Sequence, residues 1–230
     1  MINILLVSAT SFETQACHSW LSTHCETTGP YQFKKGQTTI DLLISGVGLP
    51  ITAFSMGSQL ASRKYQFAIQ AGIGGTLDKS IAIGEVVQIV SERFGDLGAE
   101  AADGSFLDLQ DLGLMERESG IFSQSGQILN PLALTSKLPY TKCNGISVNR
   151  VSGSDSSIES LREKYPEAQI ESMEGAAFFY ACRFHQVPML QLRSISNLVE
   201  ERNRERWNIP LAISHLNQAL ITQLEEMLNP

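Results

Sequence analysis

The chain has 230 residues, enough to bury one large core, whereas two ordinary domains would both be small, so we expect a single domain over residues 1–230. Charged residues make up only 18% and hydrophobic residues 43%, which excludes a disordered chain and indicates that much surface lies in a core or against a partner subunit. The 17 Lys and Arg residues against 24 Asp and Glu residues give a net charge of −7 without a dense basic run, which argues against a nucleic-acid partner.

The first third of the sequence alternates short runs rich in Ile, Leu and Val with helical stretches. The predicted elements are a strand at Met1–Ser8, a helix at Glu13–Leu21, a hairpin at Gln32–Ser45, a helix at Pro50–Lys64 and a strand at Phe67–Ala71. The last of these strands runs directly into a glycine-rich segment at residues 72–75.

The rest of the sequence continues this alternation after one long interruption. The predicted elements are a strand at Gly84–Glu92, a polar connection at Phe94–Gly126, a strand at Gly145–Val151, helices at Ser156–Tyr165 and Glu174–His185, a strand at Val187–Ser196 and a helix at Pro210–Met227. The length of the connection indicates a functional loop or an oligomer contact. Strands and helices that alternate without a repeat or linker predict an α/β layered domain.

The sequence also bears on where the protein works. No stretch approaches the ~18–20 uninterrupted apolar residues of a bilayer span, and residues 1–7 lack the features of a signal peptide. The four cysteines, Cys17, Cys25, Cys143 and Cys182, are too few for a disulfide scaffold, and their spacing matches no zinc pattern. We therefore expect a cytoplasmic protein that binds no membrane and holds no metal.

The glycine-rich segment is the first candidate for a binding site. Residues without a Cβ let backbone N–H groups approach a ligand, and open α/β sheets bind ligands at the carboxyl ends of their strands, so Gly72, Ile73 and Gly74 are candidate substrate contacts. The alternative is a tight turn. A dinucleotide fingerprint fails here because Leu77 occupies the place of its last glycine.

Two further segments carry polar groups at element ends. Glu174 would lie in the first turn of an apolar helix, where free N–H groups favour a carboxylate that can accept bonds from the vicinal hydroxyls of a sugar. A plain acid at a helix start is the alternative, and the neighbouring Met173 fits a core as well as a ligand contact. Ser196 and Asn197 end a strand, and an amide there can both donate and accept toward a heterocycle.

Together these segments resemble a known family. The first strand and loop with Glu13, the glycine-rich segment, 172–177 and 193–197 resemble the purine nucleoside phosphorylase and nucleosidase superfamily in order and spacing over nearly the whole chain. Within it, 94–100 and 196–207 are most similar to the futalosine hydrolases, the nucleosidases of the alternative menaquinone pathway.

The resemblance implies a three-layer α/β/α fold around a mixed, partly closed sheet, and a homo-oligomer with its active site near a subunit contact. It implies no metal or organic cofactor. It places Glu13 at the attacking water, Met173 and Glu174 at the ribose, and Asn197 at the purine. The implied reaction is hydrolysis of the N-ribosidic bond of futalosine, which releases hypoxanthine.

Three alternatives remain open at this point. A methylthioadenosine/S-adenosylhomocysteine nucleosidase is disfavoured by Asn197, because its amide NH₂ suits the two acceptors of a 6-oxopurine better than the acceptor and donor of a 6-aminopurine. A nucleoside phosphorylase is disfavoured because the segment 8–13 offers a carboxylate and no cation for phosphate. A purine-nucleoside binding protein without turnover is the alternative of another class.

Overall fold

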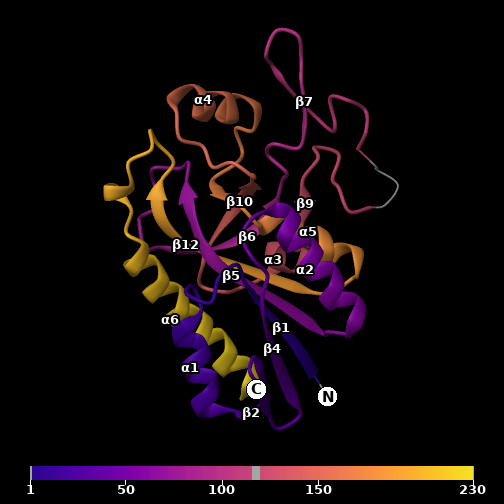
Figure 1. The fold of residues 1–230 in the computed structure, drawn as a ribbon, viewed down its shortest axis with the longest axis vertical. Coiled ribbons are helices and arrows are strands. Elements are labelled where there is room, and N and C mark those ends of the chain that lie inside the picture. The colour runs from indigo at the N-terminus through magenta and orange to yellow at the C-terminus, as the bar shows by residue number, and fades with distance from the viewer. Residues whose placement is uncertain (1, 116–119, 230) are drawn as a thin grey trace.

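A computed structural model describes residues 2–115 and 120–229 (Figure 1). Its strands are β1 (Ile2–Ser8), β2 (Glu26–Gly29), β3 (Gln32–Lys35), β4 (Thr38–Ile44), β5 (Phe67–Thr76), β6 (Val86–Glu92), β7 (Gly98–Glu100), β8 (Phe106–Asp108), β9 (Ile128–Leu129), β10 (Thr141–Ser147), β11 (Ile170–Ser172) and β12 (Met189–Leu198). Its helices are α1 (Gln15–His24), α2 (Leu49–Ser62), α3 (Pro131–Thr135), α4 (Asp155–Lys164), α5 (Gly175–Phe184), the 3₁₀ helix η1 (Arg204–Arg206) and α6 (Ile209–Leu228).

The central sheet is mixed and partly closed, as predicted. Its strand order is β11-β10-β6-β12-β5-β1-β4-β3-β2, with β9 beside β6. Strands β1, β4, β5 and β12 run parallel, whereas β6 is antiparallel to β12. Strand β11 pairs with β10 on one side and, antiparallel, with β5 on the other, so this half of the sheet curls back on itself.

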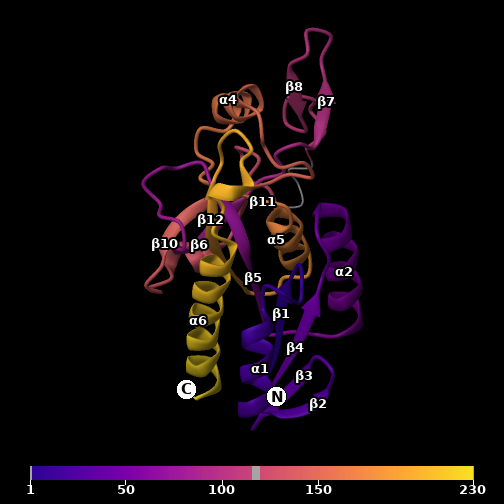
Figure 2. The same ribbon diagram turned by 60° about the vertical axis from the view of Figure 1, so that its left-hand side comes forward.

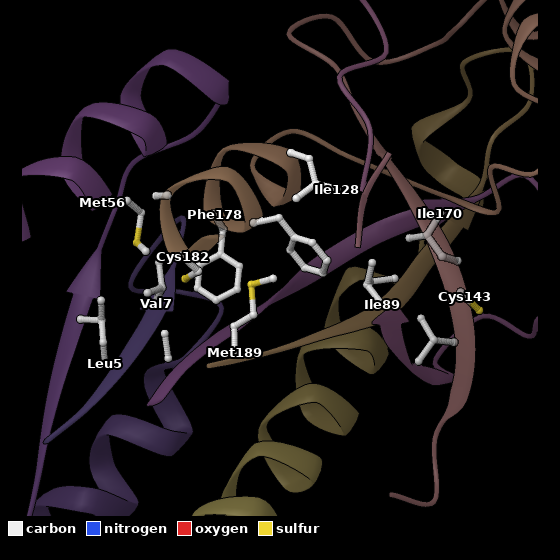
Figure 3. Packing of buried hydrophobic residues seen from close by; sticks show 14 of the residues in the cluster. Leu5, Val7, Met56, Ile89, Ile128, Cys143, Ile170, Phe178, Cys182 and Met189 are labelled. Carbon is white, nitrogen blue, oxygen red and sulfur yellow. The ribbon is translucent and has the colours of Figure 1, made fainter. Parts of the chain in front are cut away.

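Helices cover both faces of the sheet, which confirms the three layers. Side chains of β1 alternate between these faces: Ile4 and Leu6 pack in the apolar cluster that includes α1 and α6, and Leu5 and Val7 in the cluster that includes α2 and α5. Figure 3 shows Leu5 and Val7 gathered with the side chains of the second cluster. A strand buried on both sides needs the continuous apolar run that predicted it.

Most predicted elements agree with the structure to within a few residues. The glycine-rich segment is not a tight turn, because β5 continues through it to Thr76. The strand predicted at Gly145–Val151 lies earlier, at Thr141–Ser147, where only Cys143 and Ile146 are buried apolar side chains and the first two residues are exposed. The predicted connection Phe94–Gly126 holds the β7–β8 hairpin, which projects from the sheet (Figure 2), and its residues 116–119 lie outside the described part.

Helices α2 and α5 lie side by side on one face of the sheet (Figure 2). Helix α2 follows the carboxyl end of β4, and α5 follows that of β11. The parallel strands β1, β5 and β12 end at the same edge as β4. Their ends and the starts of both helices therefore meet at one edge, the usual place of a ligand site in such a sheet. Within the described ranges, no helix is long and apolar enough to cross a membrane.

Candidate active site

Glu13 is fixed in the turn after β1 by donors from two strands. Its Oε2 accepts hydrogen bonds from Ser8 Oγ (3.2 Å), the Thr10 N–H (3.0 Å) and Thr10 Oγ1 (3.2 Å). Its Oε1 accepts one from the Ile73 N–H on β5 (3.1 Å). Because a carboxylate only accepts, this set of donors suits it and leaves lone pairs of Oε1 for a further partner. Glu13 therefore lies beside the glycine-rich segment of β5.

Glu174 lies immediately before α5 and is buried. Its Oε1 accepts a hydrogen bond from the Gly48 N–H at the start of α2 (3.1 Å), and its Oε2 lies 3.5 Å from Arg193 Nη1. Burial raises the pKa of this carboxyl, while the Arg193 guanidinium and the Gly48 N–H act to lower it. The charge of Glu13 also raises the pKa of Glu174, so the two carboxylates lie within electrostatic range of each other.

Arg193 belongs to this site although no role was predicted for it from the sequence. It is 1% exposed, and its guanidinium donates to Ile73 O (3.3 Å) and to Gln70 Oε1 (3.3 Å) as well as to Glu174. A Cβ on Gly72 would collide with Arg193 Nη1 and lie 3.2 Å from Glu13 Oε1. The glycine thus lets a cation enter between the two carboxylates. The signal that could have found it is a single Arg in an otherwise uncharged buried strand.

The amide of Asn197 lies further along the same edge and is half-buried. Ser196 Oγ lies 2.8 Å from Asn197 Oδ1 and 3.2 Å from Gly74 O, and can donate to either. Asn197 Nδ2 donates to Leu198 O (2.8 Å) and faces Gly75, where a Cβ would lie 3.0 Å away. With Oδ1 turned to the serine, the amide presents its NH₂, and one of its two hydrogens remains available to a ligand.

The other predicted site residues occupy different positions. Gly72 and Ile73 contact the acidic and basic groups directly, as described above. Gly74 serves the closure of the sheet, because a Cβ there would lie 3.0 Å from Glu171 O on β11. Met173 is half-buried directly before Glu174. Glu13, Glu174 and Asn197, far apart in sequence, all lie around the end of β5.

The mixed-charge segment after β12, expected to be solvated, is exposed except at Glu200 and Trp207, which are half-buried. Arg206 forms an ion pair with Glu200 (3.0 Å), and the Arg202 guanidinium lies 5.3 Å from the Trp207 ring centre. Across residues 2–115 and 120–229, no three His, Cys, Asp or Glu side chains are grouped to hold a metal ion.

Comparison with known proteins identifies the family. No family model matches the chain. The chain is 34% identical over 183 residues to the futalosine hydrolase of Acidothermus cellulolyticus, a match that covers 79% of this chain and 73% of the relative. It is also 34% identical over 185 residues to the futalosine hydrolase of Streptomyces coelicolor, covering 78% and 76%. The chain belongs to the futalosine hydrolase family. It is accordingly an N-glycosyl hydrolase of the nucleosidase type.

Solved structures of this family and of a neighbouring one share the fold. A native futalosine hydrolase of Helicobacter pylori superposes with a TM-score of 0.75 at 18% identity, covering 98% of both chains. A 5'-methylthioadenosine/S-adenosylhomocysteine nucleosidase from Neisseria meningitidis, in complex with methylthio-immucillin-A, gives a TM-score of 0.75 at 16% identity and covers 98% of this chain and 100% of its own. At these identities the likeness concerns the fold, and it matches the mixed α/β architecture described above.

Proposed function

We propose that the protein hydrolyses the N-ribosidic bond of futalosine and releases hypoxanthine and dehypoxanthine futalosine, as a step of menaquinone biosynthesis. The observation that carries the proposal is the arrangement around the end of β5. There, two buried carboxylates, Glu13 and Glu174, lie within electrostatic range, and the amide of Asn197 presents its NH₂ at the same edge. Family membership at 34% identity supports the same substrate.

The chemistry assigns each of these groups a task. Cleavage of an N-ribosidic bond develops positive charge on the sugar and negative charge on the departing base. Glu174 accepts bonds from the 2′ and 3′ hydroxyls and places its anion beside the cationic sugar, with Met173 against the ribose. Asn197, backed by Ser196, donates to the purine as electrons arrive there. Glu13 orients water and takes up its proton, with Gly72, Ile73 and Gly74 forming the floor of the site.

Water is the nucleophile that this site favours over phosphate. Among the described residues, the buried cation beside the carboxylates is Arg193, which is already paired with Glu174. Its Nη1 and Glu13 Oε1 both lie close to the Cα of Gly72. One guanidinium between two carboxylates leaves the described site with a net negative charge, which would repel an incoming phosphate dianion. This argument disfavours the phosphorylase alternative.

The proposal is tested by following base release in phosphate-free buffer. We expect the protein to release hypoxanthine from futalosine faster than it releases the base from inosine or methylthioadenosine, as measured by chromatography. Cleavage only on addition of phosphate, with ribose 1-phosphate formation from inosine, would overturn the hydrolytic proposal. Cleavage of methylthioadenosine faster than futalosine would contradict futalosine as the substrate. Tight binding of all three nucleosides without base release would indicate a binding protein.

Replacing Asn197 with Asp tests the leaving group. A 6-oxopurine offers two acceptors, N7 and O6, to an amide NH₂, whereas a carboxylic acid donates once and accepts once, which fits a 6-aminopurine. We expect Asn197→Asp to shift the kcat/KM ratio of futalosine to its 6-amino analogue about ten- to hundred-fold toward the amino substrate. Asn149→Asp is the matched control, because its amide bonds Asp96 outside the edge of β5. An unchanged ratio in Asn197→Asp counts against a hypoxanthine leaving group.

The apolar face formed by α2 and α5 supports a homo-oligomer, which we propose is at least a dimer. Phe54 is 77% and Phe184 64% exposed, and Ile51 on α2 and Tyr180 on α5 are exposed as well. A mainly apolar cavity of about 460 Å³ lies between the two helices. Exposed apolar surface of this extent marks an interaction site. Because Gly48 and Glu174 bond at the starts of these helices, a second copy on this face would lie next to the active site.

A charge on this face should separate the subunits. We expect Phe54→Glu to sediment as a monomer at concentrations where the wild type is a dimer, because burying an unpaired carboxylate in an apolar interface is costly. Leu132→Glu, at an exposed leucine on α3, should leave the oligomeric state unchanged. A Phe54→Glu variant that remains dimeric in analytical ultracentrifugation would show that another surface forms the interface.

We also propose that the protein works in the cytoplasm. Its four cysteines are free thiols, of which Cys17, Cys143 and Cys182 are buried. Burial raises the pKa of the Cys17 and Cys143 thiols to about 12, which keeps them protonated and unreactive as packing groups. Such thiols suit a reducing compartment.

A further inference from the structure

A second buried carboxylate network lies beneath the active site and has no task in the mechanism above. Glu92, the last residue of β6, is 1% exposed. Its Oε1 accepts a hydrogen bond from Gln191 Nε2 (3.1 Å) and its Oε2 one from Ser147 Oγ (2.9 Å). Among the described residues no cation forms an ion pair with it. A buried carboxyl without such a partner is costly to stability, and a polar network of this kind points to a specific use.

Two glycines make room for this carboxyl. A Cβ on Gly145 of β10 would lie 2.6 Å from Glu92 Oε1, and a Cβ on Gly175, the first residue of α5, would overlap the same oxygen. Glycine in a strand or at a helix start gives up packing and increases the entropy lost on folding. The fold therefore loses stability at Glu92, Gly145 and Gly175, three positions far apart in the sequence, in order to hold the Glu92 carboxyl against the start of α5.

Two hydrogen-bonded routes lead from Glu92 to the active site. In the first, Gln191 Nε2 also donates to Gln70 Oε1 (2.9 Å), which accepts from Arg193 Nη2 (3.3 Å), and Arg193 in turn contacts Glu174. In the second, Ser147 Oγ donates to Glu92 and accepts from the N–H of Ala176 in the first turn of α5 (2.8 Å). The first route ends at the side chain of Glu174. The second ends at the start of α5, which directly follows Glu174 in the chain.

We infer that Glu92 is a positioning residue for the hydrolysis proposed above: through Gln191 and Gln70 its carboxylate orients the Arg193 guanidinium, and through Ser147 it fixes the start of α5, so that Glu174 faces the ribose. The inference rests on the proposed function. Glu92 touches no substrate, and its effect reaches the reaction only through Arg193 and Glu174.

The ionised form of Glu92 is the one that fits the hydrogen bonds of this network. Both of its oxygens accept in the structure, and Gln191 must present its NH₂ to Glu92 and to Gln70 at once. A protonated Glu92 that donates to Gln191 would turn that amide around, and its oxygen would then face Gln70 Oε1 unless Gln70 also turned. A turned Gln70 presents its NH₂ to Arg193, which then loses an acceptor.

Titration of Glu92 therefore couples to the site at ordinary pH. Burial raises the pKa of Glu92 to about 7, and the Arg193 charge with the Ser147 and Gln191 bonds acts against this rise. Of the elements packed against the carboxyl, β12 contributes Arg193 as the charged group, whereas β10 and α5 present Ser147, Gly145 and Gly175. Active enzyme should accumulate as the pH rises through about 7.

The test is the Glu92→Gln variant, assayed for futalosine hydrolysis across pH. Glutamine cannot accept at both positions, so we expect kcat to fall about ten- to hundred-fold near pH 8, with KM changed little. Near pH 6, where wild-type Glu92 is mostly protonated, the deficit should shrink to within about three-fold. A residue that only held the fold together would give a deficit that does not depend on pH in this way.

As the pH rises through about 7, the stability of the wild type should fall while its activity rises. The pKa of Glu92 is higher in the folded chain than its usual value of 4.5, so folding is favoured below that value, and the advantage is lost as the pH rises through about 7. The Glu92→Gln variant does not lose stability in this way, because an amide does not titrate. We expect its melting temperature relative to the wild type to rise between about pH 5 and pH 8.

Controls separate this inference from the function on which it rests. Asp41→Asn removes another buried carboxylate of the sheet, paired with Arg63, and should lower stability without changing kcat or its pH dependence. Gln191→Met breaks the first route without removing Glu92, should lower kcat in the same way and, combined with Glu92→Gln, should add little. A wild type that cleaves no nucleoside refutes the function, whereas an active wild type with an equally active Glu92→Gln variant, or an unchanged deficit across pH, refutes the role of Glu92.

Discussion

Replacing Glu13 with Gln is expected to lower kcat about 10²- to 10⁴-fold, equivalent to about 3–5 kcal/mol of transition-state stabilisation. The amide oxygen can still accept from Ser8 and Thr10, so the turn keeps its shape. The amide nitrogen then faces the Ile73 N–H, and it cannot take up a proton from water. Turnover of futalosine and inhibition by hypoxanthine, measured side by side, should show lost catalysis with base binding retained.

The matched control for this variant is Glu26→Gln, which changes an exposed carboxylate on β2. It should turn over futalosine at the wild-type rate and melt at the wild-type temperature, because surface substitutions of this kind change stability by about ±0.5 kcal/mol. Should Glu13→Gln retain more than about a tenth of the wild-type kcat, the carboxylate would not be the group that activates water.

Two polar residues of the site were predicted from their local context. Glu174 stands before an apolar helix and Asn197 ends a strand, so each lies where an element ends at the ligand-binding edge of the sheet. A window of ten residues contains that information, whereas Glu13 was placed only by the resemblance to the nucleosidases. The order of strands and helices was predicted for the same reason, because the spacing of apolar residues is a local property of the sequence.

Arg193 and Glu92 escaped prediction because their surroundings exist only in the folded chain. Arg193 acquires its partners from β5 and from the start of α5, 120 and 19 residues away, and Glu92 acquires Gln191 99 residues away. In the sequence, Glu92 looks like an ordinary charged residue at a strand end. Arg193 stands out as the single charge of an apolar strand, but the sequence does not show which groups surround it. The glycines that admit them, Gly72 and Gly175, likewise look like turn or helix-start residues in the sequence.

The course of β5 was also set by tertiary pairing rather than by local preference. Three glycines in residues 72–75 weaken a strand, yet β12 on one side and β11 on the other pair with this segment. Side chains at Gly74 or Gly75 would lie within about 3 Å of neighbouring atoms, so only glycine permits both strands to approach. Closure of the sheet thus decided the conformation of a segment whose composition favoured a turn.

The replacement of Glu174 by Gln should impair both the chemical step and substrate binding. The carboxylate opposes the positive charge that develops on the ribose, and removing one such preorganised group typically lowers kcat by 10²–10³-fold or more. Because Glu174 also binds the hydroxyl pair, we expect about a 10³-fold loss of kcat, near 4 kcal/mol, with KM raised as well. Rapid-quench measurement of hypoxanthine release from bound futalosine would separate the chemical step from binding.

Stability and a matched control complete this test. Glu174→Gln leaves the buried Arg193 with Ile73 O and Gln70 as acceptors, and the lost contact was long at 3.5 Å, so the free energy of unfolding should fall by about 1–3 kcal/mol rather than the larger cost of breaking a tight buried pair. Glu167→Gln, which removes the partner of Arg93 away from the edge of β5, should show a similar or smaller loss of stability with unchanged kcat. If Glu174 stabilises the positive charge on the ribose, a variant without its carboxylate should lose more than ten-fold in rate. A Glu174→Gln variant with activity within ten-fold of the wild type would therefore mean that another group stabilises that charge.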